Sequence, residues 1–222
     1  MIKLCIFDLD GTVLDTVETI AYYANASLEK NGIAPIPVFE YKKLAGMGIV
    51  NLIKNMLNYR ECYSEELFDR VFRDYDEAYN KDTAYKSKIF DGLKEVLDKL
   101  KENGIKLAIV SNKPDYAAKD VVNLIYGKDY FAFVAGQREG IALKPSPDAV
   151  ISVIEDMGVS KSECVYIGDT SVDMKTGKNT NVFTVGVLWG FREEAELVES
   201  GADAIAKTPK DLYEIIMSAD KQ

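Results

Sequence analysis

Short apolar runs alternate with helical patterns along most of this chain, and that alternation restricts the fold more than any other feature. The predicted strands cover residues 3–7, 106–110, 131–135, 164–167, 182–187 and 203–205. The predicted helices cover residues 92–102, 115–125, 147–157, 171–180, 193–200 and 209–218. Strands that alternate with helices indicate βαβ units and a parallel sheet. We therefore predict an α/β fold with a doubly wound, Rossmann-like parallel sheet.

One long segment breaks this alternation. Between residues 15 and 85 the apolar side chains recur only at helical spacing. The segment is too long for a βα connection, which usually has about 2–6 residues. We expect residues 1–14 and 86–222 to form the α/β core, and residues 15–85 to form a small all-helical cap domain inserted after the first strand. A cap over the carboxyl edge of the sheet would cover the place where ligands of such sheets bind.

The composition excludes several kinds of chemistry. The chain contains no histidine, so Ser-His-Asp catalysis, Cys-His catalysis and His-ligated zinc are excluded. It has 36 acidic and 27 basic residues, a net charge of −9 that argues against nucleic acid as a partner. Its apolar runs are short and broken by charges, which argues against a membrane span. Catalysis is left to carboxylates, lysines and hydroxyls, together with a hard cation such as Mg²⁺.

Cysteine usage bears on the cellular setting. Cys5, Cys62 and Cys164 are widely spaced and odd in number. They fit neither a CxxC metal site nor a disulfide framework. We expect a cytoplasmic protein in a reducing compartment.

The first predicted strand ends in a pair of acids. Asp8 and Asp10, in Asp8-Leu9-Asp10-Gly11-Thr12, are two residues apart and would share a face of the strand. Two neighbouring carboxylates repel each other unless a cation or a shared proton separates their roles. A polar turn at the strand end is the competing interpretation, because Asp-Gly is a common turn dipeptide.

A second apolar strand also ends in acid. Asp169 follows the strand at 164–167, and Asp173 lies in the first turn of the next helix. Asp173 could also simply compensate the helix dipole. Because parallel strands end at one edge, we expect Asp8, Asp169 and Asp173 to converge on a site suited to Mg²⁺.

Two further segments carry candidate phosphate contacts. Ser111 and Asn112 follow the strand at 106–110, where a hydroxyl near a helix start can bind phosphate or act as an N-cap. Lys144 precedes the rigid segment Pro145-Ser146-Pro147, although most lysines are solvated surface charges.

Taken together and in this order, these motifs resemble those of the haloacid dehalogenase superfamily, specifically its phosphoglycolate phosphatase-like group. Residues 8–12 match the first motif of that family, Ser111 the second, Lys144 the third and residues 168–173 the fourth. The helical insertion is similar to the family's cap.

The resemblance implies a Mg²⁺-dependent phosphatase that hydrolyses a small, phosphoglycolate-like monoester. Asp8 would attack phosphorus and form an aspartyl-phosphate, while Asp10 would act as the acid and then the base. Mg²⁺ would be held by Asp8, the main-chain carbonyl of Asp10, and Asp169. The resemblance assigns phosphate binding to Ser111, Asn112 and Lys144, and supporting roles to Thr12 and Asp173. Asp173 would support the metal or its waters, or orient Lys144.

Several alternatives remain open. A dehalogenase would have no use for Asp10, and a phosphonoacetaldehyde hydrolase would carry a lysine where Asn51 stands. A β-phosphoglucomutase-like sugar-phosphate mutase would share every core motif. A nonenzymatic, receiver-like phosphoacceptor would need neither Asp10 nor a lid, and a purely structural α/β module ranks last.

The sequence says little about the substrate. We expect the chain to bind a small phosphorylated metabolite, and to bind neither nucleic acid nor a membrane. We expect a monomer or a homodimer. Lys43 and Gly46 lie in the predicted cap loop at 42–48, where substrate-reading residues are usual in the group that the chain resembles. Lys43 could meet a small anion such as a carboxylate, or could simply be solvated.

Overall fold

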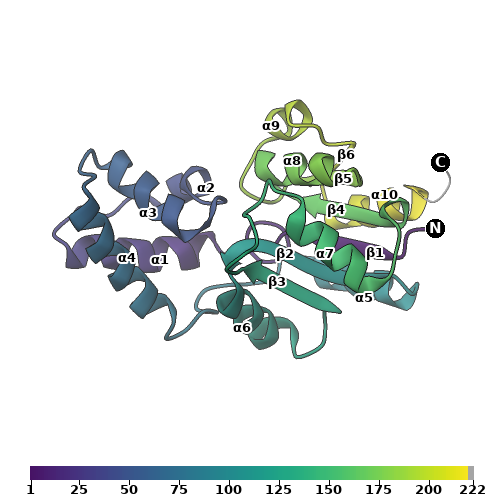
Figure 1. The fold of residues 1–222 in the computed structure, drawn as a ribbon, viewed down its shortest axis with the longest axis horizontal. Helices are drawn as coiled ribbons and strands as arrows, with labels where there is room; N and C mark the ends of the chain where they lie inside the picture. The colour runs from purple at the N-terminus through teal and green to yellow at the C-terminus, as the bar shows by residue number, and fades with distance from the viewer. Residues whose placement is uncertain (220–222) are drawn as a thin grey trace.

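A single six-stranded parallel sheet forms the centre of the fold (Figure 1). The computed structural model describes residues 1–219. The strands are β1 (Leu4–Phe7), β2 (Lys106–Pro114), β3 (Phe133–Gln137), β4 (Cys164–Gly168), β5 (Phe183–Val187) and β6 (Ala204–Ala206). They lie in the order β3-β2-β1-β4-β5-β6. The prediction of a doubly wound α/β fold is confirmed.

The strand bounds differ from the prediction mainly at β2. This strand continues past residue 110 to Pro114, after its register against β3 shifts between Val110 and Pro114. As a result, Ser111 and Asn112 belong to the end of the strand and not to a loop that follows it. The local sequence hides this extension, because Ser-Asn-Lys-Pro has the composition of a turn.

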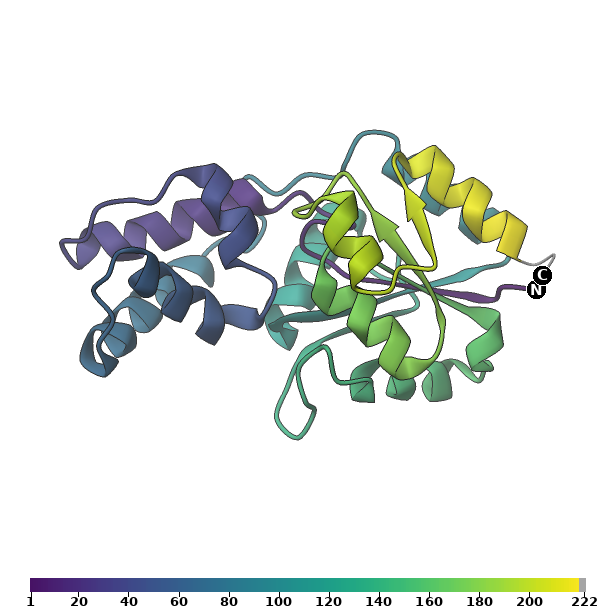
Figure 2. The same ribbon diagram turned by 90° about the horizontal axis from the view of Figure 1, so that it is seen from above.

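Helices cover both faces of the sheet (Figures 1 and 2). They are α5 (Leu93–Glu102), α6 (Asp115–Tyr126), α7 (Asp148–Met157), α8 (Ser171–Thr180), α9 (Glu194–Glu199) and α10 (Pro209–Ala219). On β1, Cys5 and Phe7 join one buried cluster and Leu4 and Ile6 join another. A strand that is buried on both faces reads as a continuous apolar run, as parallel sheets require.

The segment between β1 and α5 is helical. It contains α1 (Val17–Lys30), the 3₁₀ turn η1 (Val38–Glu40), α2 (Tyr41–Leu44), α3 (Gly48–Tyr59) and α4 (Glu65–Tyr79). We call these elements the helical unit; they share a buried cluster of their own that includes Ile53, Met56, Leu57 and Val71. Ala117 and Phe191 of the core join that cluster, so the unit packs on the core.

Two connecting segments join the helical unit to the core, and they are tied together. The main-chain N–H of Asp15 donates to the carbonyl of Lys88 at 2.8 Å, and that of Lys88 donates back at 3.2 Å.

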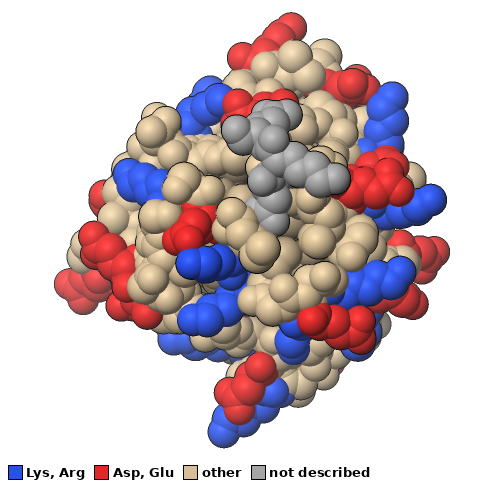
Figure 3. Space-filling model, turned by 90° about the vertical axis from the view of Figure 1, so that its right-hand side faces the viewer, with Lys and Arg blue, Asp and Glu red and all other residues tan. Residues whose placement is uncertain are grey.

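Figure 2 shows the helical unit at one end of the molecule, beside the sheet. Figure 3 looks onto the opposite end, where basic and acidic side chains lie interspersed.

No helix within residues 1–219 is both long enough and apolar enough to cross a membrane. The three cysteines are free, with Cys5 and Cys164 buried in the core.

The packing of α5 gives a direct test of the core. Leu97 is fully buried in the cluster on one face of the sheet, so Leu97→Ala should lower the free energy of unfolding by about 2–5 kcal/mol. Leu124→Ala is the matched control, because that side chain is 61% exposed and its loss should change stability by less than about 0.5 kcal/mol. Urea unfolding of both variants measures the difference, and equal losses would contradict this packing.

Candidate active site

The strand order brings the predicted acids to one edge of the sheet. β1 lies between β2 and β4, and Phe7 pairs with Ile109 on one side and Ile167 on the other. The main-chain N–H of Asp8 donates to the carbonyl of Ile167 at 2.8 Å, which fixes the chain where it leaves β1. Asp8, Ser111 and Asp169 therefore leave neighbouring strands at the same edge, where open α/β sheets bind their ligands.

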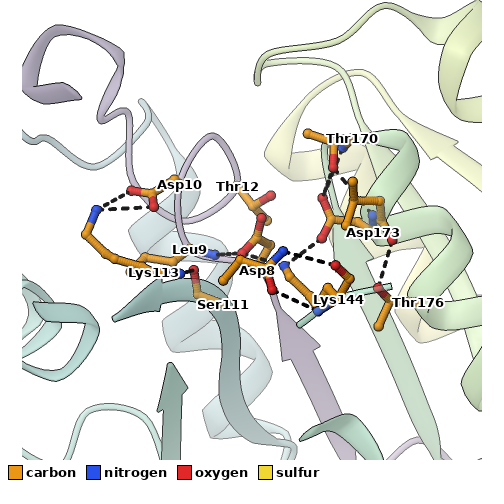
Figure 4. A network of polar contacts seen from close by, with 12 residues as sticks. Asp8, Leu9, Asp10, Thr12, Ser111, Lys113, Lys144, Thr170, Asp173 and Thr176 are labelled. Atoms are coloured by element: carbon orange, nitrogen blue, oxygen red, sulfur yellow. Dashed lines mark hydrogen bonds and ion pairs between the residues drawn. The ribbon is translucent and has the colours of Figure 1, made fainter. Parts of the chain in front are cut away.

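Asp8 is buried and held through one of its two oxygens. Its Oδ1 accepts a hydrogen bond from the N–H of Leu9 and lies 2.7 Å from the Nζ atom of Lys144 (Figure 4). Both contacts use Oδ1. Within the described residues 1–219, the Oδ2 atom of Asp8 has no such contact, so its lone pairs remain available for a cation or for phosphorus.

Lys144 bridges two carboxylates. Its side chain is 2% exposed, and its Nζ lies 2.7 Å from Asp8 and 2.8 Å from Oδ1 of Asp173. Burial alone lowers the pKa of this amine, but the charges of Asp173 and Asp8 outweigh burial and raise the pKa well above its ordinary value. Lys144 is accordingly a fixed positive charge beside Asp8.

Asn112 positions Lys144. Its Oδ1 accepts from the main-chain N–H of Lys144 at 2.8 Å, and its Nδ2 donates to the carbonyls of Lys144 and Gly46, each at 3.2 Å. We expected this side chain to bind phosphate. In the structure, these two carbonyls already accept hydrogen bonds from the amide group of Asn112. The side chain therefore connects the segment at Lys144 with the predicted cap loop at Gly46.

Asp169 is completely buried and is oriented from two sides. Its Oδ1 accepts from the hydroxyl of Thr12 and its Oδ2 from the N–H of Phe191, both at 2.8 Å. Gly11 has a φ of +85°, and a Cβ there would lie 2.3 Å from Oδ2 of Asp169. Only glycine fits this turn, so the Asp-Gly pair in the first motif serves the packing of Asp169 as well as the turn.

Asp173 has donors on both of its oxygens. Oδ2 accepts from the N–H and the hydroxyl of Thr170, in a capping box that begins α8. Oδ1 accepts from Lys144 at 2.8 Å and from the hydroxyl of Tyr166 at 3.2 Å. Asp173 thus contacts Lys144, in keeping with the orienting role considered from the sequence, and it also caps α8.

When they are ionised, the three buried carboxylates carry more negative charge than Lys144 neutralises. Oxygens of Asp8, Asp169 and Asp173 lie within 4.8 Å of one another. Burial and, second, the charge of Asp173 raise the pKa of Asp8 to about 7, although Lys144 opposes this shift. Burial and, after it, the charges of Asp173 and Asp8 raise the pKa of Asp169 well above its ordinary value. Hard oxygen donors with excess negative charge suit a cation such as Mg²⁺.

The hydrogen bonds that each acid accepts also indicate which of the three acids has oxygens available to bind a cation. Asp8 has Oδ2 available, and each oxygen of Asp169 accepts a single hydrogen bond. These two carboxylates would be the better ligands for a cation, because the oxygens of Asp173 already accept from Lys144 and Thr170. The side chain of Asp10 lies outside this cluster.

Asp10 instead pairs with Lys113, which sequence reasoning missed. The Nζ of Lys113 lies 2.9 and 3.2 Å from the two oxygens of Asp10, and the lysine side chain is only 7% exposed. Most lysines that follow a strand are solvated, so the position of Lys113 in the sequence indicated no role. The spacing could have indicated that Lys113 belongs to the site. Ser111 and Lys113 are two residues apart, so they share a face of the strand if the strand continues past residue 110.

A cavity of about 60 Å³ opens between the sheet edge and the helical unit. Asp8, Asp10, Ser111 and Lys113 line it from the core. Ile20, Ala45, Gly46, Gly48, Ile49, Leu52, Tyr75, Asp76 and Tyr79 line it from the helical unit. Ser111 is buried and its Oγ accepts from the N–H of Lys113 at 3.2 Å, so the hydroxyl proton is free for a ligand oxygen.

Of the two predicted cap residues, only Gly46 lines this cavity. The side chain of Lys43 is 77% exposed and its nearest carboxylate, on Glu40, is 3.9 Å away. Lys43 is a solvated lysine in this structure, the second of the two interpretations of its sequence position.

Comparison with known proteins agrees with this geometry. Residues 5–187 match the family model of haloacid dehalogenase-like hydrolases. A phosphoglycolate phosphatase of Aquifex aeolicus is 29% identical over 216 residues, 96% of each chain. A second, of Psychrobacter arcticus, is 31% identical over 194 residues, 85% of this chain and 84% of that one. A crystal structure from Lactobacillus delbrueckii subsp. bulgaricus, provisionally named a phosphoglycolate phosphatase, aligns with a TM-score of 0.91 and 31% identity, covering 96% of this chain and 98% of that one.

The pKa of Asp8 leads to a prediction about Mg²⁺. With a pKa of about 7 in the metal-free protein, Asp8 is mostly protonated at pH 6 and mostly ionised at pH 8, and the proton competes with the cation. Mg²⁺ affinity should therefore rise about tenfold from pH 6 to pH 8. Calorimetric titration at the two pH values measures this rise. Glu66→Gln, on an exposed helix face, should behave as the wild type, whereas equal affinities at both pH values would contradict the assignment.

Proposed function

The chain belongs to the haloacid dehalogenase-like hydrolase family and is a phosphoric monoester hydrolase; we propose that it is a Mg²⁺-dependent phosphatase that forms an aspartyl-phosphate on Asp8. The observation that carries this proposal is the bridge from Lys144 to Asp8 and Asp173. The bridge fixes one oxygen of Asp8 and leaves the other for attack, beside a positive charge that can bind a phosphoryl oxygen.

In the first half-reaction, the Oδ2 atom of Asp8 bonds to phosphorus and the ester P–O bond breaks. The electron pair of that bond goes to the leaving oxygen, which takes a proton from Asp10. In the second half-reaction, water attacks phosphorus, Asp10 accepts a proton from the water, and the bond between phosphorus and Asp8 breaks. Inorganic phosphate leaves, and both acids return to their starting states.

The residues around Asp8 manage the charge of the phosphoryl group. Lys144 and the hydroxyl of Ser111 would donate to its oxygens, and Asn112 keeps Lys144 in place. When bound, Mg²⁺ would supply positive charge between the carboxylate and the phosphoryl group, and Asp8 and Asp169 would hold it. Thr12 and the N–H of Phe191 keep Asp169 oriented for that purpose.

The helical unit would serve as the cap. It supplies the apolar and aromatic walls of the cavity, and the two segments that join it to the core lie side by side at Asp15 and Lys88. Segments paired in this way can act as a hinge, so that residues 15–85 open for exchange and close to exclude bulk water. A cytoplasmic setting, consistent with three free cysteines, and a small phosphorylated metabolite as substrate belong to the same proposal.

One observation supports a phosphatase rather than a sugar-phosphate mutase. The relatives that match over nearly the whole chain are named phosphoglycolate phosphatases.

Removing the nucleophile tests the proposal. Asp8→Asn should lower phosphate release from 2-phosphoglycolate by at least about 10⁴-fold and abolish any phosphorylated form of the enzyme. Phosphate release in Mg²⁺ and mass spectrometry of the quenched enzyme measure the two effects. Asp129→Asn is a matched control, because Asp129 is an exposed aspartate with a φ of +62° that asparagine also tolerates. Substantial turnover by Asp8→Asn would exclude Asp8 as the nucleophile.

A further inference from the structure

Three consecutive residues of the core connect Asp169 with the helical unit. They follow β5 and are Gly190, Phe191 and Arg192. Gly190 packs so closely that a Cβ there would lie 2.4 Å from Oδ2 of Asp169. The N–H of Phe191 donates to the same oxygen at 2.8 Å. The proposed chemistry uses this hydrogen bond to orient Asp169, but it does not use Arg192.

The segment turns from the core toward the helical unit at Phe191. Just before it, the indole of Trp189 donates to the carbonyl of Thr12 at 3.0 Å, which anchors the chain on the core. The side chain of Phe191 instead joins the buried cluster of the helical unit. The N–H that orients Asp169 therefore belongs to a residue whose side chain packs with the helical unit.

Arg192 binds the main chain of the helical unit. Its guanidinium donates to the carbonyl of Lys42, and it also lies 3.5 Å from the carbonyl of Lys43 and 3.4 Å from that of Ala45. These residues belong to the end of α2. The last carbonyls of a helix have no donor within the helix, so a guanidinium can satisfy several of them together.

Two further contacts hold Arg192 in this position. The Nζ of Lys42 donates to the carbonyl of Gly190 at 3.1 Å, so the core and the helical unit exchange hydrogen bonds here. The Nε of Arg192 lies 3.3 Å from Glu196 on α9, and Glu196 also accepts from the N–H of Ser171 at the start of α8. Arg192 is therefore held by the core while it binds the helical unit.

The bound segment of the helical unit also forms part of the active-site cavity. Ala45 and Gly46 line that cavity. The carbonyl of Ala45 faces Arg192, and the carbonyl of Gly46 accepts from Asn112. A movement of residues 42–46 away from the core would therefore break the contacts of Arg192, the residue next to the N–H that orients Asp169.

We propose that Arg192 is a positioning residue that couples residues 42–46 to Asp169, the ligand of Mg²⁺ in the proposed function. While the guanidinium holds the carbonyls of 42–46, the N–H of Phe191 stays on Asp169 and the carboxylate keeps one orientation. This inference rests on the proposed Mg²⁺-dependent function. Because coupling between two sites is reciprocal, bound Mg²⁺ should in turn hold residues 42–46 against the core.

Calorimetric titration with Mg²⁺ at pH 8 tests the first direction of this coupling. Arg192→Met keeps the apolar stem and removes the guanidinium, so it should weaken Mg²⁺ affinity about tenfold, as expected for the loss of a group that orients a metal ligand. Lys42→Met removes a single hydrogen bond from the opposite side and should weaken the affinity about threefold. Arg192→Lys keeps a donor and should bind Mg²⁺ more tightly than Arg192→Met.

Arg70→Met is the matched control for these variants. Arg70 also pairs with a glutamate four positions away, Glu66, but both side chains are exposed on α4. This variant should bind Mg²⁺ as the wild type does. Thermal unfolding confirms that each variant is folded.

Hydrogen exchange tests the second direction without any turnover. In the wild type, saturating Mg²⁺ should slow the exchange of the main-chain N–H groups in residues 41–46 about tenfold, because the coupling factor is the same in both directions. In Arg192→Met, Mg²⁺ should slow that exchange less than about twofold. Mass spectrometry of the peptide that contains residues 41–46 measures both rates.

The outcomes separate this inference from the function on which it rests. If the wild type binds Mg²⁺ and a folded Arg192→Met or Lys42→Met binds it equally well, the inference is overturned and the proposed function stands. The same holds if Mg²⁺ slows exchange in residues 41–46 equally in the wild type and in Arg192→Met. A wild type that binds no Mg²⁺ would overturn the Mg²⁺-dependent function and the inference together.

Discussion

The rest of the site depends on one buried contact, the amine of Lys144 held between Asp8 and Asp173. A buried lysine is stable only when carboxylates compensate its charge, and buried carboxylates need such a cation equally. Here one lysine faces three clustered acids, so the cluster keeps an excess of negative charge. In the proposed reaction, that excess would attract a divalent cation to the site. Burial and, second, the charge of Asp173 raise the pKa values of Asp8 and Asp169.

The surrounding structure is shaped by the need to hold these charges. β1 lies between β2 and β4, which places Asp8 beside the strand that carries Asp169. Gly11 allows the turn after β1 to approach Asp169, and Gly168 leaves room for the side chain of Asp173, whose Cβ would lie 2.3 Å from an added methyl group. The turn is fixed from outside as well. The hydroxyl of Tyr126 donates to the carbonyl of Val13 at 2.7 Å, and the indole of Trp189 donates to that of Thr12 at 3.0 Å.

The sequence was sufficient to predict the fold and the cluster, because apolar runs specify strands and parallel strands end at one edge. It was insufficient where a role depends on a partner far along the chain. Asn112 binds the main chain of a residue 32 positions away, and Lys113 binds Asp10 at a separation of 103. Nothing local marks either contact. Lys43 is the opposite example. Its place in the predicted cap loop suggested a substrate contact, but its side chain is exposed to solvent. The predicted domain boundaries and the catalytic roles stay predictions.

The central claim is that water attacks phosphorus on Asp8 and that the phosphoryl group leaves as inorganic phosphate. Hydrolysis of 2-phosphoglycolate in ¹⁸O-labelled water, with Mg²⁺, tests this most directly by mass spectrometry of the phosphate and of the peptide that contains Asp8. The account predicts one ¹⁸O atom in inorganic phosphate for each ester consumed, and none in the Asp8 carboxylate. Label in the Asp8 carboxylate, or a transferred phosphoryl group with little labelled phosphate released, would contradict it.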